Sequence, residues 1–207
     1  FPDRNLNDLY PGIDRAPLNA DLERADADCI AFERDIQGRL DDLERTAHAD
    51  LAAAVRRYEA IDDLMGRIGS YSGLVYAGNT TDPKIAKFYG DMNDRLTAAY
   101  LHLLFFTLEL NRIDDGVIEA ALVADDRLGR YRHWFSELRK AKPYQLEDKL
   151  EELFHEKSVT GAQAWNRLFD ETMAALKFEV DGETLPIEGT LHLLSDTKEK
   201  KREAAFH

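Results

Sequence analysis

The spacing of apolar residues in this 207-residue chain is helical over most of its length. The clearest stretch runs from Leu51 to Val75, where apolar side chains recur at every third or fourth position over roughly seven turns. Helices with such a stripe must bury it against other helices. The sequence therefore predicts a mainly all-α fold, a multi-helix bundle with long antiparallel helices.

Two further long helices are marked by start and stop signals. The stripe over 18–36 is followed by Gly38, a residue typical of the position after a helix. The stripe over 83–112 begins with a proline, and Thr81 or Asp82 is placed to cap its free amides. Both segments are predicted to be complete helices.

The later part of the third helix, 100–110, is apolar nearly all round, which places it at the centre of the bundle. Shorter helical patterns follow it. They cover Asp115–Ala124, Asp126–Lys140, Gln145–Lys157 and Gly161–Leu176.

One segment, 178–187, departs from the helical pattern. Its apolar residues bracket Asp181-Gly182, a pair typical of a type I′ turn, so a small β-hairpin is expected there. Residues 1–195 are interpreted as one helical domain. Residues 196–207 stop in a helical pattern without a C-cap, and are interpreted as the start of a helix that leads into a region absent from this sequence.

Charge and composition exclude several classes of function. With 27 basic and 40 acidic residues the formal charge is −13, which disfavours nucleic acid and anionic membranes as partners. The sequence shows neither a membrane-spanning run nor an export signal, so a soluble, cytoplasmic protein is expected. The single cysteine, Cys29, lies in an amphipathic stretch and is predicted to be a small buried side chain.

The histidines lack the spacing of a zinc peptidase motif, in which two histidines lie four residues apart on one helix. His155-Glu156 begins like such a motif but meets Val159 at the second ligand position, and His155 is interpreted as a helix-surface residue. His133 and Glu137 share a helix face but supply too few ligands. The sequence therefore predicts neither catalytic nor metal-binding residues.

Aromatic residues are the remaining candidates for a binding surface. Tyr71, Tyr76 and Tyr89 are candidate lining of a peptide groove, because tyrosine offers apolar area together with a hydrogen bond. Core packing is the alternative for all three. Trp134 and Trp165 carry the same two interpretations, and burial in the core is favoured for both.

Several blocks, taken in order, resemble the N-terminal part of oligoendopeptidase F proteins, relatives of the thimet oligopeptidases. The opening Asn5-Leu6-Asn7-Asp8-Leu9-Tyr10 resembles the "DLSDLY" start of that family. Later agreement covers Tyr71–Pro83 (YSGLVYAGNTTDP), Leu103–Leu110 (LLFFTLEL), Trp134–Leu146 (WFSELRKAKPYQL) and Trp165–Glu171 (WNRLFDE).

The resemblance implies a role in a longer zinc metallopeptidase, whose zinc is held by a later HExxH helix. This sequence ends before any such motif, so no catalytic or zinc-binding residue is carried over, and the fragment alone is expected to be inactive. The implied role is a helical wall of a deep channel that admits short, unfolded peptides, with the catalytic domain of the same chain as partner. The alternative is a free-standing acidic helical interaction module, since the first 50 residues hold 13 acids and six bases.

Overall fold

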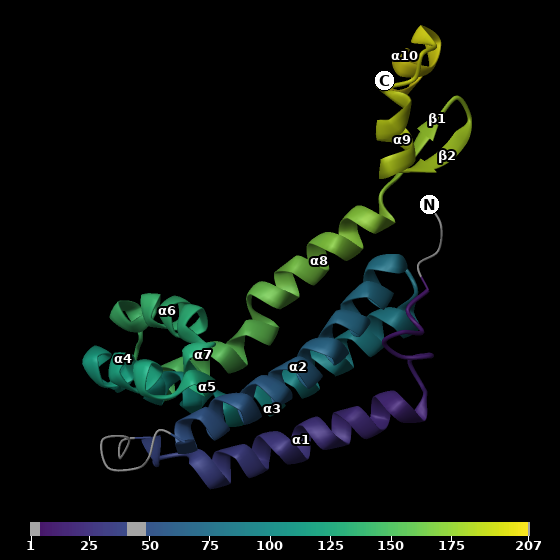
Figure 1. Ribbon diagram of the computed structural model, residues 1–207. Coiled ribbons are helices and arrows are strands. Elements are labelled where there is room, and N and C mark those ends of the chain that lie inside the picture. The colour runs from purple at the N-terminus through teal and green to yellow at the C-terminus, as the bar shows by residue number, and fades with distance from the viewer. Residues whose placement is uncertain (1–4, 41–48, 207) are drawn as a thin grey trace.

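Three long helices form the body of the molecule: α1 (Ala16–Ile36), α2 (Ala49–Gly78) and α3 (Pro83–Arg112). The computed structural model describes residues 5–40 and 49–206. The three helices lie side by side and alternate in direction (Figure 1). The predicted mainly α-helical bundle with long antiparallel helices is confirmed. Predictions that concern residues 1–4, 41–48 and 207, including part of the acidic first 50 residues, lie outside the described residues.

The start of α3 follows the predicted cap. Asp82 is the N-cap, and its Oδ1 accepts a hydrogen bond from the backbone N–H of Lys84 at 2.8 Å. Pro83 takes the first helical position, where its missing N–H costs nothing. Thr81 instead donates its hydroxyl to Asn79, so of the two candidates Asp82 is the cap.

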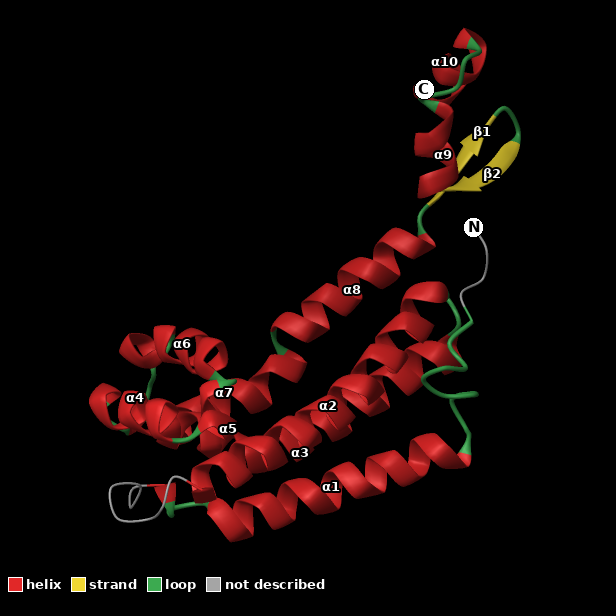
Figure 2. Ribbon diagram, viewed as in Figure 1, coloured by secondary structure: helices red, strands yellow, loops and turns green. Residues whose placement is uncertain are grey.

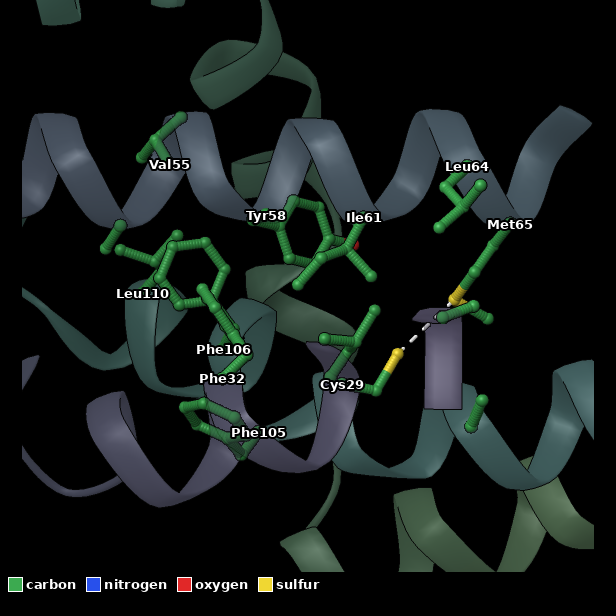
Figure 3. Packing of buried hydrophobic residues seen from close by; sticks show 14 of the residues in the cluster. Cys29, Phe32, Val55, Tyr58, Ile61, Leu64, Met65, Phe105, Phe106 and Leu110 are labelled. Atoms are coloured by element: carbon green, nitrogen blue, oxygen red, sulfur yellow. Dashed lines mark hydrogen bonds between the residues drawn. The ribbon is translucent and has the colours of Figure 1, made fainter. Parts of the chain in front are cut away.

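The core lies where α1, α2 and α3 meet (Figure 3). Phe106 is fully buried, lies edge-on to Phe32 with ring centroids 5.1 Å apart, and stacks on Tyr58 at the same distance. Cys29 is also fully buried, with Sγ 3.6 Å from the sulfur of Met65, as expected for a small buried side chain. The central position predicted for the later part of α3 is confirmed, since α3 packs against α1, α2, α6 and α7.

The shorter helices follow as α4 (Asp115–Ala124), α5 (Asp126–Gly129), α6 (Arg132–Lys140), α7 (Asp148–Thr160) and α8 (Ala162–Ala175).

One of the shorter predictions is wrong, because the single helix expected over 126–140 is divided into α5 and α6. At the break, Arg130 and Tyr131 both donate hydrogen bonds to the carboxylate of Glu59 on α2. The turn thus brings two side chains of this segment onto the same acidic group. A 3-10 turn, η2 (Lys142–Tyr144), follows α6. Helix α7 therefore begins at Asp148, three residues after the expected start at Gln145.

Arg139 joins α6 to the end of α3. Its guanidinium donates from Nη1 to the carbonyl of Leu110 at 3.1 Å and from Nη2 to that of Ile113 at 2.5 Å. The carbonyl of Leu110, in the last turn of α3, also accepts the backbone N–H of Ile113, and the carbonyl of Ile113 also accepts from Nζ of Lys142 at 3.2 Å. A side chain from α6 therefore completes the C-terminal end of α3.

The end of the described chain forms a small separate unit. Strands β1 (Lys177–Val180) and β2 (Glu183–Pro186) pair antiparallel, with Val180 opposite Glu183. Asp181 and Gly182 have φ angles of 53° and 82°, as a type I′ turn requires, so the predicted hairpin is confirmed. Ile187 begins α9 (Ile187–Leu193), which packs on both strands, and α10 (Glu199–Phe206) follows. This unit stands beyond the end of α8 (Figure 2).

Candidate functional site

A small polar cleft lies between α3 and α8 and has a volume of about 90 Å³. Typical ligand pockets are roughly 300–1,000 Å³, so this cleft has room for one side chain or one peptide group and not for a cofactor. Its lining comes from α3, the end of α7 and α8. The residues are Tyr89, Gly90, Asn93, Asp94, Val159, Gln163, Ala164, Asn166, Arg167 and Asp170.

Gly90 of α3 faces the end of the Arg167 side chain of α8 at this cleft. A Cβ atom at position 90 would lie 3.3 Å from Nη1 of Arg167, a tighter contact than most side chains make. The guanidinium of Arg167 also lies 3.8 Å from the carboxylate of Glu171. The cleft therefore holds one cationic group among carboxylates and side-chain amides, groups that pair readily with the polar atoms of a peptide.

Two of the three predicted tyrosines meet beside the cleft. Tyr76 of α2 and Tyr89 of α3 stack with ring centroids 4.5 Å apart and an interplanar angle of 4°. Tyr76 is only 4% exposed, and its hydroxyl has no hydrogen-bond partner among the described residues. Burial raises the pKa of Tyr76, and the charges of Glu171 and Asp170 raise it further. The hydroxyl is therefore a protonated donor held close to the cleft.

Tyr71 lies apart from this pair. It is 3% exposed and packs edge-on against Tyr10 and Phe88, with ring centroids 5.2 Å and 6.2 Å away. The structure thus brings together Tyr76 and Tyr89 and places Tyr71 in the core behind them. Lining of a peptide channel by Tyr71, Tyr76 and Tyr89 stays a prediction.

Two other interpretations of aromatic residues are wrong. Trp165, expected in the core, is 70% exposed on α8. His155, expected on a helix surface, lies over the ring of Tyr100 at 4.9 Å with its Nε2 buried and unpartnered among the described residues. Trp134 matches expectation, since it packs against Tyr58 at the edge of the core.

The pair His133 and Glu137 does not form a site of its own. The carboxylate of Glu137 accepts from Lys140 at 2.6 Å, and this contact lowers the pKa of Glu137. Within residues 5–40 and 49–206, no three histidine, cysteine, aspartate or glutamate side chains are grouped so that they could hold a metal ion. No helix in those same ranges is long and apolar enough to cross a membrane.

The outward side of α7 and α8 is apolar, a feature that the sequence reasoning missed. The cleft residues put the polar side of α8 against α3, which leaves its large apolar side chains facing solvent. We define the outer face of α7–α8 by its exposed apolar residues. They are Leu150, Leu153, Phe154, Trp165, Leu168 and Phe169. The helical spacing of these apolar residues is visible in the sequence, but periodicity alone does not show which side of a helix is buried.

Three acidic residues of α1 are paired with side chains of α2 and α3. Asp26 binds Arg95 at 2.6 Å, and Glu33 lies 2.6 Å from Nδ1 of His102, so both reach α3. Asp35 accepts from Arg57 of α2 at 2.9 Å. These carboxylates join the three long helices to one another.

Comparison with known proteins agrees with this architecture. Residues 109–178 match the sequence model of the family described as Oligopeptidase F. The fold is similar to the crystal structure of oligoendopeptidase-F from Enterococcus faecium, with a TM-score of 0.77 and 18% identity over 92% of this chain. This chain spans 38% of the length of that protein. Among curated protein sequences no match was found. The resemblance predicted from the sequence blocks is thus confirmed for residues 109–178, and the shared fold extends over most of the chain.

Proposed function

We propose that this chain is the noncatalytic N-terminal helical domain of a zinc-dependent oligoendopeptidase. The observation that carries the proposal is that the fold of an oligoendopeptidase-F structure extends over 92% of this chain, together with the family match over 109–178. In this proposal residues 1–195 form the domain, and 196–207 begin the helix that leads to the catalytic region. The whole protein would act in the cytoplasm.

The role proposed for the domain is one wall of a channel that admits only short, unfolded peptides. Helices α2 and α3 each have 30 residues, which gives rods about 45 Å long at about 1.5 Å per residue. The aromatic core and the ion pairs from α1 hold these rods together. A wall built in this way is stiff enough to exclude folded proteins from a channel.

The reaction itself would take place on the rest of the protein. Zinc would polarise the scissile carbonyl and activate a water molecule for amide hydrolysis. The described residues of this chain offer no group of ligands that fits a zinc ion, so no step of hydrolysis is assigned to them. Their contribution is to confine the peptide and exclude larger substrates.

Peptide contact is proposed for the tyrosine pair beside the α3–α8 cleft, with Tyr71 as the ring that supports the wall from within. Removing the hydroxyl of Tyr89, which lines the cleft, by Tyr89→Phe in the intact peptidase should raise KM for a short peptide, because a donor at the cleft wall would be lost. The matched control is Tyr131→Phe, whose hydroxyl is already bonded to Glu59 away from the cleft. Equal KM values for Tyr89→Phe and the unsubstituted enzyme would contradict peptide contact by this hydroxyl.

The proposal is tested on the purified 207-residue chain by zinc analysis and a quenched-peptide assay. We expect less than stoichiometric zinc and no cleavage. Turnover that a chelator abolishes and added zinc restores would overturn it. A second test is the source reading frame, which should continue past His207 into an HExxH segment.

The alternative, a free-standing acidic interaction module, has weaker support. It depends on free carboxylates near the N-terminus, but Asp26, Glu33 and Asp35 already face cationic or imidazole groups of α2 and α3. A stop codon directly after His207 would favour this alternative over the peptidase domain.

A further inference from the structure

We propose that the outer face of α7–α8 is the surface on which the catalytic region of the same polypeptide docks. This inference rests on the proposed function, because it names the partner of the domain and the residues that meet it.

The orientation of α8 is the first reason. Trp165 is 70% exposed and Phe169 is 63% exposed, while polar residues of the same helix face α3. A surface helix normally does the opposite and turns its apolar stripe toward the core. Large contiguous apolar patches on a soluble protein mark interaction surfaces, and here the patch lies on the side of α8 away from the cleft.

The second reason is that the exposed apolar residues lie on both α7 and α8. Leu150 and Phe154 are about one turn apart on α7, and Trp165 and Phe169 are about one turn apart on α8. Gly161 joins the two helices in an unusual conformation with φ −101° and ψ −113°, and a Cβ atom there would lie 2.8 Å from the carbonyl oxygen of Lys157.

Charge argues against a second copy of this chain as the occupant. Each copy carries a formal charge of −13, and α7 and α8 together hold six acidic and three basic residues. Glu152 and Glu156 are exposed on α7, so two copies docked through this helix would bring like charges together. The occupant that fits is an apolar surface with a basic rim.

A catalytic region on the same polypeptide would meet this face at high effective concentration. The similar peptidase chain is much longer than this one, which covers 38% of it, so most of that chain lies outside the matched fold. A surface on the same polypeptide docks without the entropy cost of a separate association. The match to Oligopeptidase F over 109–178 includes both helices of the face.

Hydroxyl-radical footprinting read by mass spectrometry tests the proposal, with the intact polypeptide compared with the 207-residue chain. Labelling of Trp165 and Phe169 should fall at least about fivefold in the intact polypeptide, because their exposure drops to that of an interface core. Val123, which is 70% exposed on α4, is the internal control and should label equally in both.

A negative charge placed on the outer face of α7–α8 should separate the helical domain from the catalytic region. In the intact polypeptide Phe169→Asp should restore labelling of Phe154, whereas Asn166→Asp, which puts the same charge on the cleft side of α8, should not. Phe169 is exposed in this chain, so the circular dichroism of the 207-residue Phe169→Asp chain should be unchanged, which separates undocking from unfolding.

Three outcomes overturn the proposal. Unchanged labelling in an intact zinc peptidase would refute docking and leave the proposed function standing. Concentration-dependent protection of Trp165 in the 207-residue chain, with a dimer by sedimentation, would make the occupant a second copy. A reading frame that ends at His207 would remove both the proposed function and the docking partner.

Discussion

Two phenylalanines show how differently one residue type contributes in this molecule. Phe106 touches Phe32 and Tyr58 at the centre of the core, and Phe169 lies on the outer face of α8. Phe106→Ala should lower the free energy of unfolding by about 3–5 kcal/mol, because a cavity replaces the ring. Phe169→Ala should change it by less than about 0.5 kcal/mol. Urea denaturation of the 207-residue chain measures both, and similar losses would contradict the assigned core.

His155 should make stability depend on pH. Burial lowers its pKa below the ordinary value of 6.5, and a hydrogen bond with the backbone of Thr97 opposes this only in part. At pH values between this lowered pKa and 6.5, His155 is protonated in the unfolded chain and neutral in the folded chain. The free energy of unfolding is therefore highest above pH 6.5 and decreases as the pH falls below it.

The measurement is the urea midpoint from pH 8 to pH 5. His155→Phe keeps a ring over Tyr100 and should lose less stability over this range than the parent chain. The same substitution at His192, which is exposed on α9, should leave the pH dependence as it was. A urea midpoint of the parent chain that rises from pH 8 to pH 5 would contradict the expected loss of stability at low pH.

The misjudged residues share one physical cause. Trp165 and His155 lie on helices that were correctly predicted. The sequence did not indicate which side of each helix faces α3. A tryptophan is usually buried and a histidine in a polar stretch is usually exposed. Both preferences were overridden because α8 turns its amide-rich side toward α3 and α7 turns His155 toward Tyr100.

At the scale of elements, the cap of α3 has a measurable effect. Asp82→Ala removes the acceptor for the N–H of Lys84 and should lower the free energy of unfolding by about 1 kcal/mol. Asp82→Asn keeps an acceptor oxygen in place and should lose little. If both substitutions cost the same, the effect belongs to the charge and not to the hydrogen bond.

Elements with local signals were predictable, and those shaped by distant contacts were not. Asp82-Pro83 and Asp181-Gly182 each determine a turn or cap from neighbouring residues alone, and both were placed correctly. At the division between α5 and α6, Tyr131 donates a hydrogen bond to Glu59, which lies 72 positions earlier in the chain. Helix α9 was not predicted, because it is short and begins directly after the second strand of the hairpin.

At the scale of the whole molecule, the unit formed by β1, β2, α9 and α10 should be separable. Its buried residues, Val180 and Thr190, lie outside the core cluster of the helices. A chain that ends at Leu176 should therefore keep the urea midpoint of the 207-residue chain and its aromatic near-ultraviolet dichroism. A large fall in the midpoint would show that this unit supports the bundle through contacts that the core cluster does not include.

The overall architecture was more predictable than the candidate site. Three long stripes of apolar residues have few ways to bury themselves, so a bundle follows from the pattern. The cleft depends on Gly90 and Arg167, residues 77 positions apart that meet only after α7 and α8 fold back along α3. Tyr76 and Tyr89 were named from their residue type, whereas their stacking required the turn between α2 and α3.

The guanidinium of Arg139 has a consequence for motion. Arg139 of α6 donates to the carbonyls of Leu110 and Ile113, so the last turn of α3 cannot open unless these hydrogen bonds to α6 also break. Terminal helical turns ordinarily open independently and exchange their amide hydrogens early. In this protein the slow-exchanging segment should extend beyond α3 into α6, so that the two helices open as one cooperative unit.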